Sequence, residues 1–383
     1  MTKNMTAALA ALAALGLGQA SAATNVKIAT VSALSGASSN VGLQLKNGAQ
    51  LAVNELKADF AKAGLNLSLV AYDDQADPAT GTAAARRIAA DRSILGVVGP
   101  MTSGVAIPAT ALLAPSHVAT VASTATNEKI TARGLKNVNR VCARDDAQGA
   151  AGGNYLAGTL KAKRVYVLND KTPYGQGLAA EAEKALKAKG VTIVQSEGVG
   201  AEERDFTALL TKIRTLRPDA VYFGGLYGQV GPFLKQLRDG GVTVPVMGGD
   251  GLDSSALIKL AGSGANNVYF TSLAPDVAAI PAAGALAARY RKSFGSDLEG
   301  VGIISYDAAR VLLQGILNAA KAAGNKAPTR EQVEKAVRAG TYRGLMTGTV
   351  QFDKNGDRTN AQMYIVRVNQ GKRSAAGTVN VRR

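Results

Sequence analysis

The sequence predicts an α/β protein of two lobes, each a doubly wound, mainly parallel sheet. Short β-rich runs alternate with helical patterns, which favours parallel strands joined by right-handed crossovers. Apolar residues at helical spacing run from Phe206 to Leu216. The strand candidates outnumber what one sheet comfortably holds. They are residues 26–31, 67–72, 94–98, 118–121, 164–168, 192–196, 220–223, 244–247 and 267–271.

The end of the chain has a different pattern. After residues 272–275, long helical patterns cover residues 282–294, 301–323 and 330–339. Residues 348–352, a turn at 353–357 and residues 362–368 then predict a β-hairpin. Residues 371–383 carry little pattern, and we expect them to be weakly ordered.

The first 22 residues are typical of a secretory signal peptide. Lys3 is followed by an apolar stretch to Leu17 and by the small residues Ala20-Ser21-Ala22. The alternative is a buried N-terminal helix. No later segment reaches 18 consecutive apolar residues, so the sequence predicts an exported, soluble chain, periplasmic or in the cell envelope. No cysteine lies near the cleavage site, which disfavours a lipoprotein.

Composition excludes several kinds of site. The chain has one cysteine, Cys142, and one histidine, His117, so neither an intrachain disulfide nor a multi-histidine metal site can form. We therefore expect no metal and no cofactor. The net charge is +16, but the basic residues are scattered and there is no tryptophan, so we expect solvated faces rather than a nucleic-acid partner.

Two polar turns follow predicted strands and indicate an anion site. Residues 99–104 include Ser103, and residues 122–127 include Thr124 and Thr126. Each turn places hydroxyls where a parallel strand ends and a helix begins, and the free N–H groups of a helix start attract anions. The alternative is simple N-capping by serine and threonine.

Nothing near these turns predicts catalysis. There is no G-x-S-x-G elbow, no phosphate-binding loop and no G-x-G-x-x-G after the first strand. We interpret Asp73 and Asp74 as turn and cap residues. Asp353–Asp357 lacks the later glutamate of a calcium loop and is interpreted as a turn. The sequence therefore favours a binding protein over an enzyme.

Several segments of the chain, in this order and spacing, carry a resemblance to a known family. They are residues 34–36 with Gly42, 46–55, 72–78, 98–99 with Ser103, Thr126 with 131–134, 170–178, 222–225, 247–251 and 352–357. Together they resemble the periplasmic branched-chain amino-acid-binding proteins of ABC importers. The resemblance implies the type I periplasmic binding fold, with three hinge crossovers near residues 142–145, 272–275 and 344–347. It places residues 23–143 and 276–345 in the N-terminal lobe, and residues 144–275 and 346–383 in the C-terminal lobe.

The resemblance also implies a ligand site. Ser103 and Thr126 match the residues that hold the ligand's α-carboxylate. The ammonium group would meet the backbone carbonyl of Thr124 and the carboxylate of Asp250. Asp250 lies among glycines, so the alternative is that it stabilises its own turn. Members of the family often carry glutamate at this position, and the shorter aspartate reaches less far.

Four further residues are expected to line the site. Tyr174 matches a cleft tyrosine of the second lobe, with a surface turn as the alternative. Val41 and Leu226 replace aromatic residues found in some members, and Tyr227 is adjacent. The α-amino-acid contacts are retained, whereas the side-chain pocket differs.

We therefore expect a monomeric binding protein that delivers an amino acid, branched-chain or otherwise aliphatic, to the membrane permease of an ABC transporter. The alternative is a receptor of the same fold for an amide, an aromatic acid or a short peptide, because one fold hosts many ligands.

Overall fold

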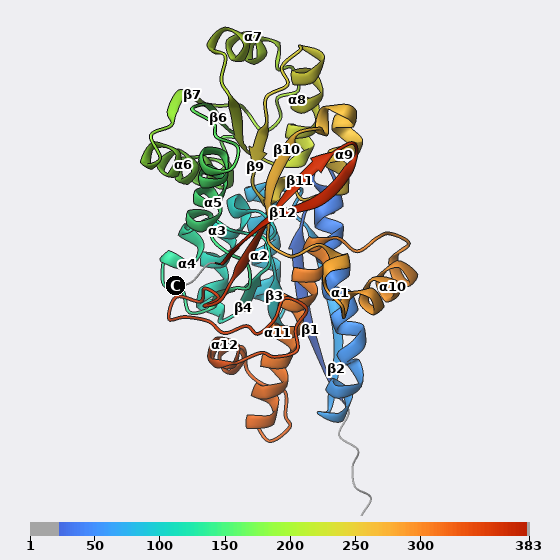
Figure 1. Ribbon diagram of the computed structural model, residues 1–383. Coiled ribbons are helices and arrows are strands. Elements are labelled where there is room, and N and C mark those ends of the chain that lie inside the picture. The colour runs from blue at the N-terminus through green and yellow to red at the C-terminus, as the bar shows by residue number, and fades with distance from the viewer. Residues whose placement is uncertain (1–22, 381–383) are drawn as a thin grey trace, which may run out of the picture.

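The computed structural model describes residues 23–380 and forms two lobes, each with its own sheet. The predicted signal peptide, residues 1–22, lies outside the described residues. Figure 1 shows the lobes one above the other, with β1, α1, α11 and α12 in the lower lobe and β6 to β10 in the upper lobe. The α/β class and the two lobes are confirmed.

The first lobe has a five-stranded parallel sheet in the order β2-β1-β3-β4-β5. Its central strand is buried along its whole length, as expected for a strand covered on both faces. The elements are β1 (Thr24–Ser32), α1 (Ser39–Lys62), β2 (Leu65–Asp73), α2 (Pro78–Ala90), β3 (Ile94–Val98), α3 (Ser103–Leu113), β4 (Ala119–Ala122), α4 (Lys129–Ala132) and β5 (Val138–Arg140).

The second lobe has a seven-stranded sheet in the order β12-β11-β10-β9-β8-β6-β7. Strands β6 to β10 are parallel, and β11 and β12 add antiparallel pairs at one edge. The elements are α5 (Asp145–Gly158), β6 (Arg164–Asn169), α6 (Pro173–Ala188), β7 (Thr192–Gly198), α7 (Thr207–Leu216), β8 (Ala220–Gly224), α8 (Tyr227–Asp239), β9 (Val246–Gly248), η2 (Asp250–Leu252), α9 (Ser255–Ala261), β10 (Val268–Ser272), β11 (Gln362–Asn369) and β12 (Lys372–Asn380).

Three late helices return to the first lobe: α10 (Ala283–Phe294), α11 (Gly300–Ala322) and α12 (Arg330–Ala339). Helix α11 packs along α1, where a Cβ on Gly48 would lie 2.3 Å from the carbonyl oxygen of Gly302. This helix is long and apolar enough to cross a membrane, but 78% of its apolar window is buried, as in a core helix. The chain therefore passes between the lobes three times: before α5, after β10 and after α12. The residue-level lobe boundaries stay a prediction.

Two expectations for the chain end are wrong. Strand β11 pairs with β12 rather than with residues 348–352, which make only the isolated bridges Tyr342–Val350 and Phe352–Arg358. Residues 372–380, expected to be weakly ordered, form β12. The reason is the two-residue turn Gln370-Gly371, whose φ values of 49° and 69° suit a tight hairpin. The short strand β5 was also not predicted.

Candidate functional site

A cavity of about 430 Å³ lies between the lobes. Its walls come from the ends of strands in both sheets, where ligands of open α/β sheets bind. Seven of the eight residues predicted for the site line it. They are Val41, Ser103, Thr124, Tyr174, Leu226, Tyr227 and Asp250. Thr126 is not among the lining residues.

One end of the cavity is built to accept an anion. Helix α3 begins at Ser103, and both Ser103 and the preceding Thr102 line the cavity. The Ser103 hydroxyl accepts a hydrogen bond from the backbone N–H of Asn127 at 3.2 Å, which leaves its proton free to be donated. The buried Thr102 hydroxyl has no hydrogen-bond partner among the described residues. Together with the first N–H groups of α3, these hydroxyls suit a carboxylate.

The sequence reasoning missed Thr102. Thr102 precedes Ser103 in the same polar turn and is the N-cap residue of α3. A threonine directly before an expected helix start could have identified it from the sequence.

The two threonines of the second polar turn, residues 122–127, differ in environment. The Thr124 hydroxyl donates to the Met101 carbonyl at 2.8 Å and holds the two turns together. Thr126 is fully buried. Its hydroxyl lies close enough to Asp145 to lower the pKa of that carboxyl, but the two groups do not meet in hydrogen-bonding geometry. Thr126 thus faces the start of α5 rather than the cavity.

The second lobe supplies an acidic group. Asp250 opens the short helix η2 directly after β9, and its Oδ1 accepts hydrogen bonds from Gln148 at 2.8 Å and from Tyr174 at 3.1 Å. The Tyr174 hydroxyl in turn accepts the backbone N–H of Gly251 at 2.8 Å. Burial raises the pKa of the Asp250 carboxyl to about 7, although these hydrogen bonds lower it. No basic side chain pairs with Asp250 among the described hydrogen bonds and ion pairs, so a ligand cation suits this end.

Part of the remaining wall is apolar. Val41 and Met101 of the first lobe and Leu226 of the second line it, together with Val301 at the start of α11. Tyr227 also lines it, and its hydroxyl accepts the backbone N–H of Asn40 at 3.1 Å. An aliphatic side chain can therefore be buried against these apolar residues.

The lobes touch on both sides of the cavity. On one side, the Asn127 side chain donates to the Pro173 carbonyl at 2.8 Å. On the other, the Asn40 side chain donates to the Ser254 hydroxyl at 2.9 Å. Next to this contact, a Cβ on Gly228 would lie 2.8 Å from the Ala37 carbonyl oxygen. The structure is therefore a closed form, and Gly228 permits the close approach of the lobes.

Gly228→Ala should weaken ligand affinity by about tenfold, since the added methyl meets backbone of the opposite lobe only in the closed form. Gly284→Ala is the matched control, because a Cβ there meets nothing within 4 Å. Calorimetric titration of both variants with the ligand checks this. Equal affinities would mean that the Ala37–Gly228 contact does not limit closure.

Within residues 23–380, no group of three or more His, Cys, Asp or Glu side chains is placed to hold a metal ion. Asp73 accepts backbone N–H groups of Leu34 and Gln75, and Asp353 accepts those of Asn355 and Asp357, so both act as turn residues.

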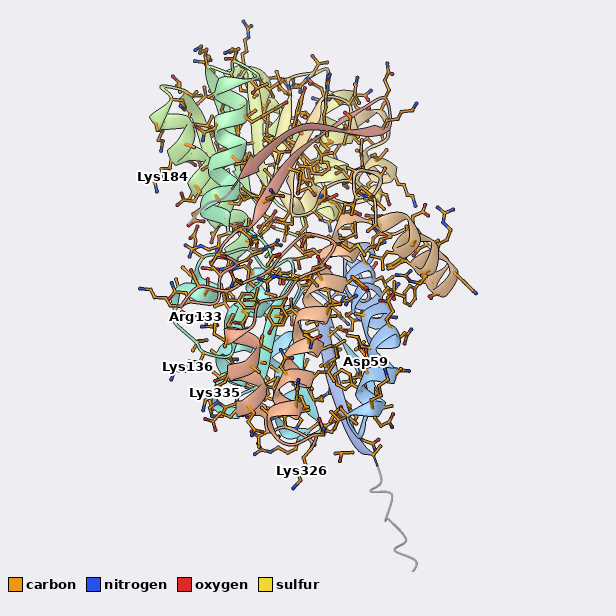
Figure 2. The ribbon with its side chains drawn as sticks, turned by 60° about the horizontal axis from the view of Figure 1, so that its bottom comes forward. Asp59, Arg133, Lys136, Lys184, Lys326 and Lys335 are labelled. Atoms are coloured by element: carbon orange, nitrogen blue, oxygen red, sulfur yellow. The ribbon has the colours of Figure 1, made fainter. Side chains whose placement is uncertain are left out.

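The basic side chains are spread over the molecule. Figure 2 shows Lys184 on the second lobe, and Lys136, Lys326 and Lys335 on the first, all directed outward. Lys184 and Lys335 form i,i+3 and i,i+4 pairs with Glu181 and Glu331 on their own helices. Lys184 and Lys335 therefore belong to solvent-exposed helix faces.

Comparison with known proteins places the chain in a family. Residues 25–373 match the sequence profile of the periplasmic binding proteins, so the chain belongs to this family. Family members are binding proteins of transporters. The chain is 36% identical over 379 residues to the Leu/Ile/Val-binding protein BraC3 of Rhizobium johnstonii, an alignment that covers 98% of this chain and 99% of BraC3.

Solved structures agree. The leucine-binding protein LivK of Thermotoga maritima has a TM-score of 0.83 and 27% identity, and the match covers 93% of this chain and 99% of LivK. The branched-chain amino-acid-binding protein LivJ of Streptococcus pneumoniae, solved with isoleucine, has the same TM-score and identity, with coverage of 94% and 100%. The resemblance inferred from the sequence motifs is confirmed.

Proposed function

We propose that this chain is the extracytoplasmic solute-binding protein of an ABC importer and that it binds an α-amino acid with an aliphatic side chain. The observation that carries the proposal is one cavity with an anion-binding helix start at Ser103, a buried acid at Asp250 and an apolar wall. These three features match the carboxylate, the ammonium group and the side chain of such a ligand. The named ligands of BraC3, LivK and LivJ support the same choice.

The mechanism follows from the two lobes. In an open form, Ser103 and the start of α3 capture the carboxylate. Closure brings Tyr174 and Asp250 of the second lobe to the ammonium group and buries the side chain against Val41 and Leu226. Because the ligand contacts both lobes only when they are closed, it shifts the population towards the closed form. The permease then recognises the closed form and receives the ligand.

In this role the chain catalyses no reaction. It binds its ligand and releases it unchanged. Thr126 is assigned a supporting role, because it lies behind the carboxylate end and beside Asp145. Export of the mature chain, beginning near Ala23, completes the proposal.

Thermal unfolding tests the ligand class. After refolding to remove any co-purified ligand, leucine, isoleucine or valine at about 100 times its Kd should add roughly 2.7 kcal/mol to the free energy of unfolding. The control ligands are 4-methylpentanoate, which lacks the ammonium group, and isopentylamine, which lacks the carboxylate. We expect neither control to raise the midpoint at the same concentration. Stabilisation by an amide or an aromatic acid, but by no α-amino acid, would replace this ligand class with the alternative one.

A further inference from the structure

A second buried acid lies behind Asp250. Asp145 is the first residue of α5 and is fully buried, but it does not line the cavity. The Nε2 atom of Gln148 lies 3.2 Å from Asp145 Oδ1 and 2.8 Å from Asp250 Oδ1. A single amide group therefore bridges the two carboxyls.

The orientation of this amide is determined at its other end. The Gln148 Oε1 atom accepts the backbone N–H of Asp250 at 3.0 Å and the Thr271 hydroxyl at 2.7 Å. Since a backbone N–H can only donate, the oxygen must face it, and both amide hydrogens then face the two acids. The glutamine thus holds the carboxyls together but supplies no net charge.

The two carboxyls lack a neutralising cation. Arg140 lowers the pKa of Asp145, but its guanidinium group is already bound. Its Nε atom lies 2.9 Å from Asp357, and its Nη atoms bind the carbonyls of Ala125 and Asn127 and the hydroxyl of Thr131. The Asp145 Oδ2 atom has no hydrogen-bond partner among the described residues.

Other titratable groups around the pair do not supply a cation either. They are Asp253, Asp357, the Cys142 thiol, and the phenols of Tyr174 and Tyr222. Burial, followed by the charge of Asp250, raises the pKa of Asp145 to about 8. Two buried carboxylates without a counter-charge are costly, so such a pair retains a proton.

We infer that Asp145, Gln148 and Asp250 form a two-acid cation receptor, which holds a proton when the site is unliganded and exchanges it for the ammonium group of the ligand. This inference rests on the proposed function, because it names what the same site requires of its ligand. The proton leaves through the cavity to solvent, and no bond other than O–H is broken. Asp145 is a positioning residue: it acts through Gln148 and Asp250 and does not touch the ligand.

The sign of the pH dependence follows. Binding needs the deprotonated pair, so affinity is highest above the pKa values of the pair and falls as the pH is lowered through them. For one proton exchanged, Kd should rise about tenfold for each pH unit below the pair's titration range. An acid that is ionised throughout this range would give a flat profile.

The test is calorimetric titration of the full mature chain with leucine near pH 7, in phosphate and in Tris buffer. The two buffers differ in ionisation enthalpy, so the difference in observed heat gives the protons released. We expect release of about one proton per ligand. Asp145→Asn should reduce this release by more than half. Asp146→Asn is the matched control, because Asp146 pairs with Arg144 at 2.9 Å and is partly exposed, and it should behave as the wild type.

The outcomes separate the two proposals. If no amino acid binds, the proposed function fails and the inference falls with it. If leucine binds but the heats in the two buffers agree, the proposed function stands and the proton exchange is overturned. If Asp145→Asn binds leucine and releases as many protons as the wild type, Asp145 has no part in the exchange. If that variant does not fold, the difference between the wild-type heats in the two buffers decides whether a proton is exchanged.

Discussion

Asp250→Asn is expected to weaken leucine binding by at least about 30-fold, because it removes the negative charge assigned to the ligand's ammonium group. Removing one partner of a buried, hydrogen-bonded charge pair costs about 2–5 kcal/mol. Both hydrogen bonds to Asp250 end on Oδ1, and an asparagine carbonyl can accept the same two. The fold around Gln148 and Tyr174 should therefore survive. Calorimetric titration at about pH 8 measures the loss.

Glu202→Gln is the matched control for this variant. Glu202 also lines the cavity, but its side chain is 94% exposed, so removing its charge should leave the affinity nearly unchanged. An equal loss in both variants would mean that the general negative potential of the cavity binds the ligand. An unchanged affinity for Asp250→Asn would overturn the assignment of Asp250.

The fold was predictable because its strands are short buried runs. In the parallel strands β3 and β8 every residue is buried, so the apolar run coincides with the element. Strand β12 has a mixed composition, and its existence depends on pairing with β11 across a two-residue turn. That pairing forms only in the folded state, and its one local signal in the sequence is the turn Gln370-Gly371.

The candidate site could be predicted from the sequence where a local motif identifies its residues. Ser103 lies where a strand ends and a helix begins, and the helix start itself provides the reason for a hydroxyl there. Gln148 could not be found in this way. It lies inside α5, 102 residues from Asp250, and only the packing of α5 against β9 and β10 brings the two together. Its contacts depend on tertiary structure rather than on a motif.

The second large effect concerns stability rather than binding. Arg140→Met is expected to lower the free energy of unfolding by about 3–5 kcal/mol, because it leaves Asp357 as a buried charge with one partner fewer. Arg140 is fully buried in β5, and Asp357 belongs to the segment that leads to β11. The ion pair therefore connects the first lobe to the last passage of the chain between the lobes. Urea unfolding measures the change.

The loss should come from the buried Asp357 carboxylate, which keeps Arg144 at 3.1 Å but loses Arg140, rather than from the missing side chain. If so, adding Asp357→Asn to Arg140→Met should recover part of the stability, since the buried carboxylate that lost Arg140 is then replaced by a neutral amide. Arg144 would still pair with Asp146 in that double variant. Arg291→Met is the control, because Arg291 is 70% exposed and its pair with Asp297 is screened by water. A double variant that loses the sum of the two single losses would show that Arg140 and Asp357 stabilise the protein independently, and that the passage between the lobes does not depend on their ion pair.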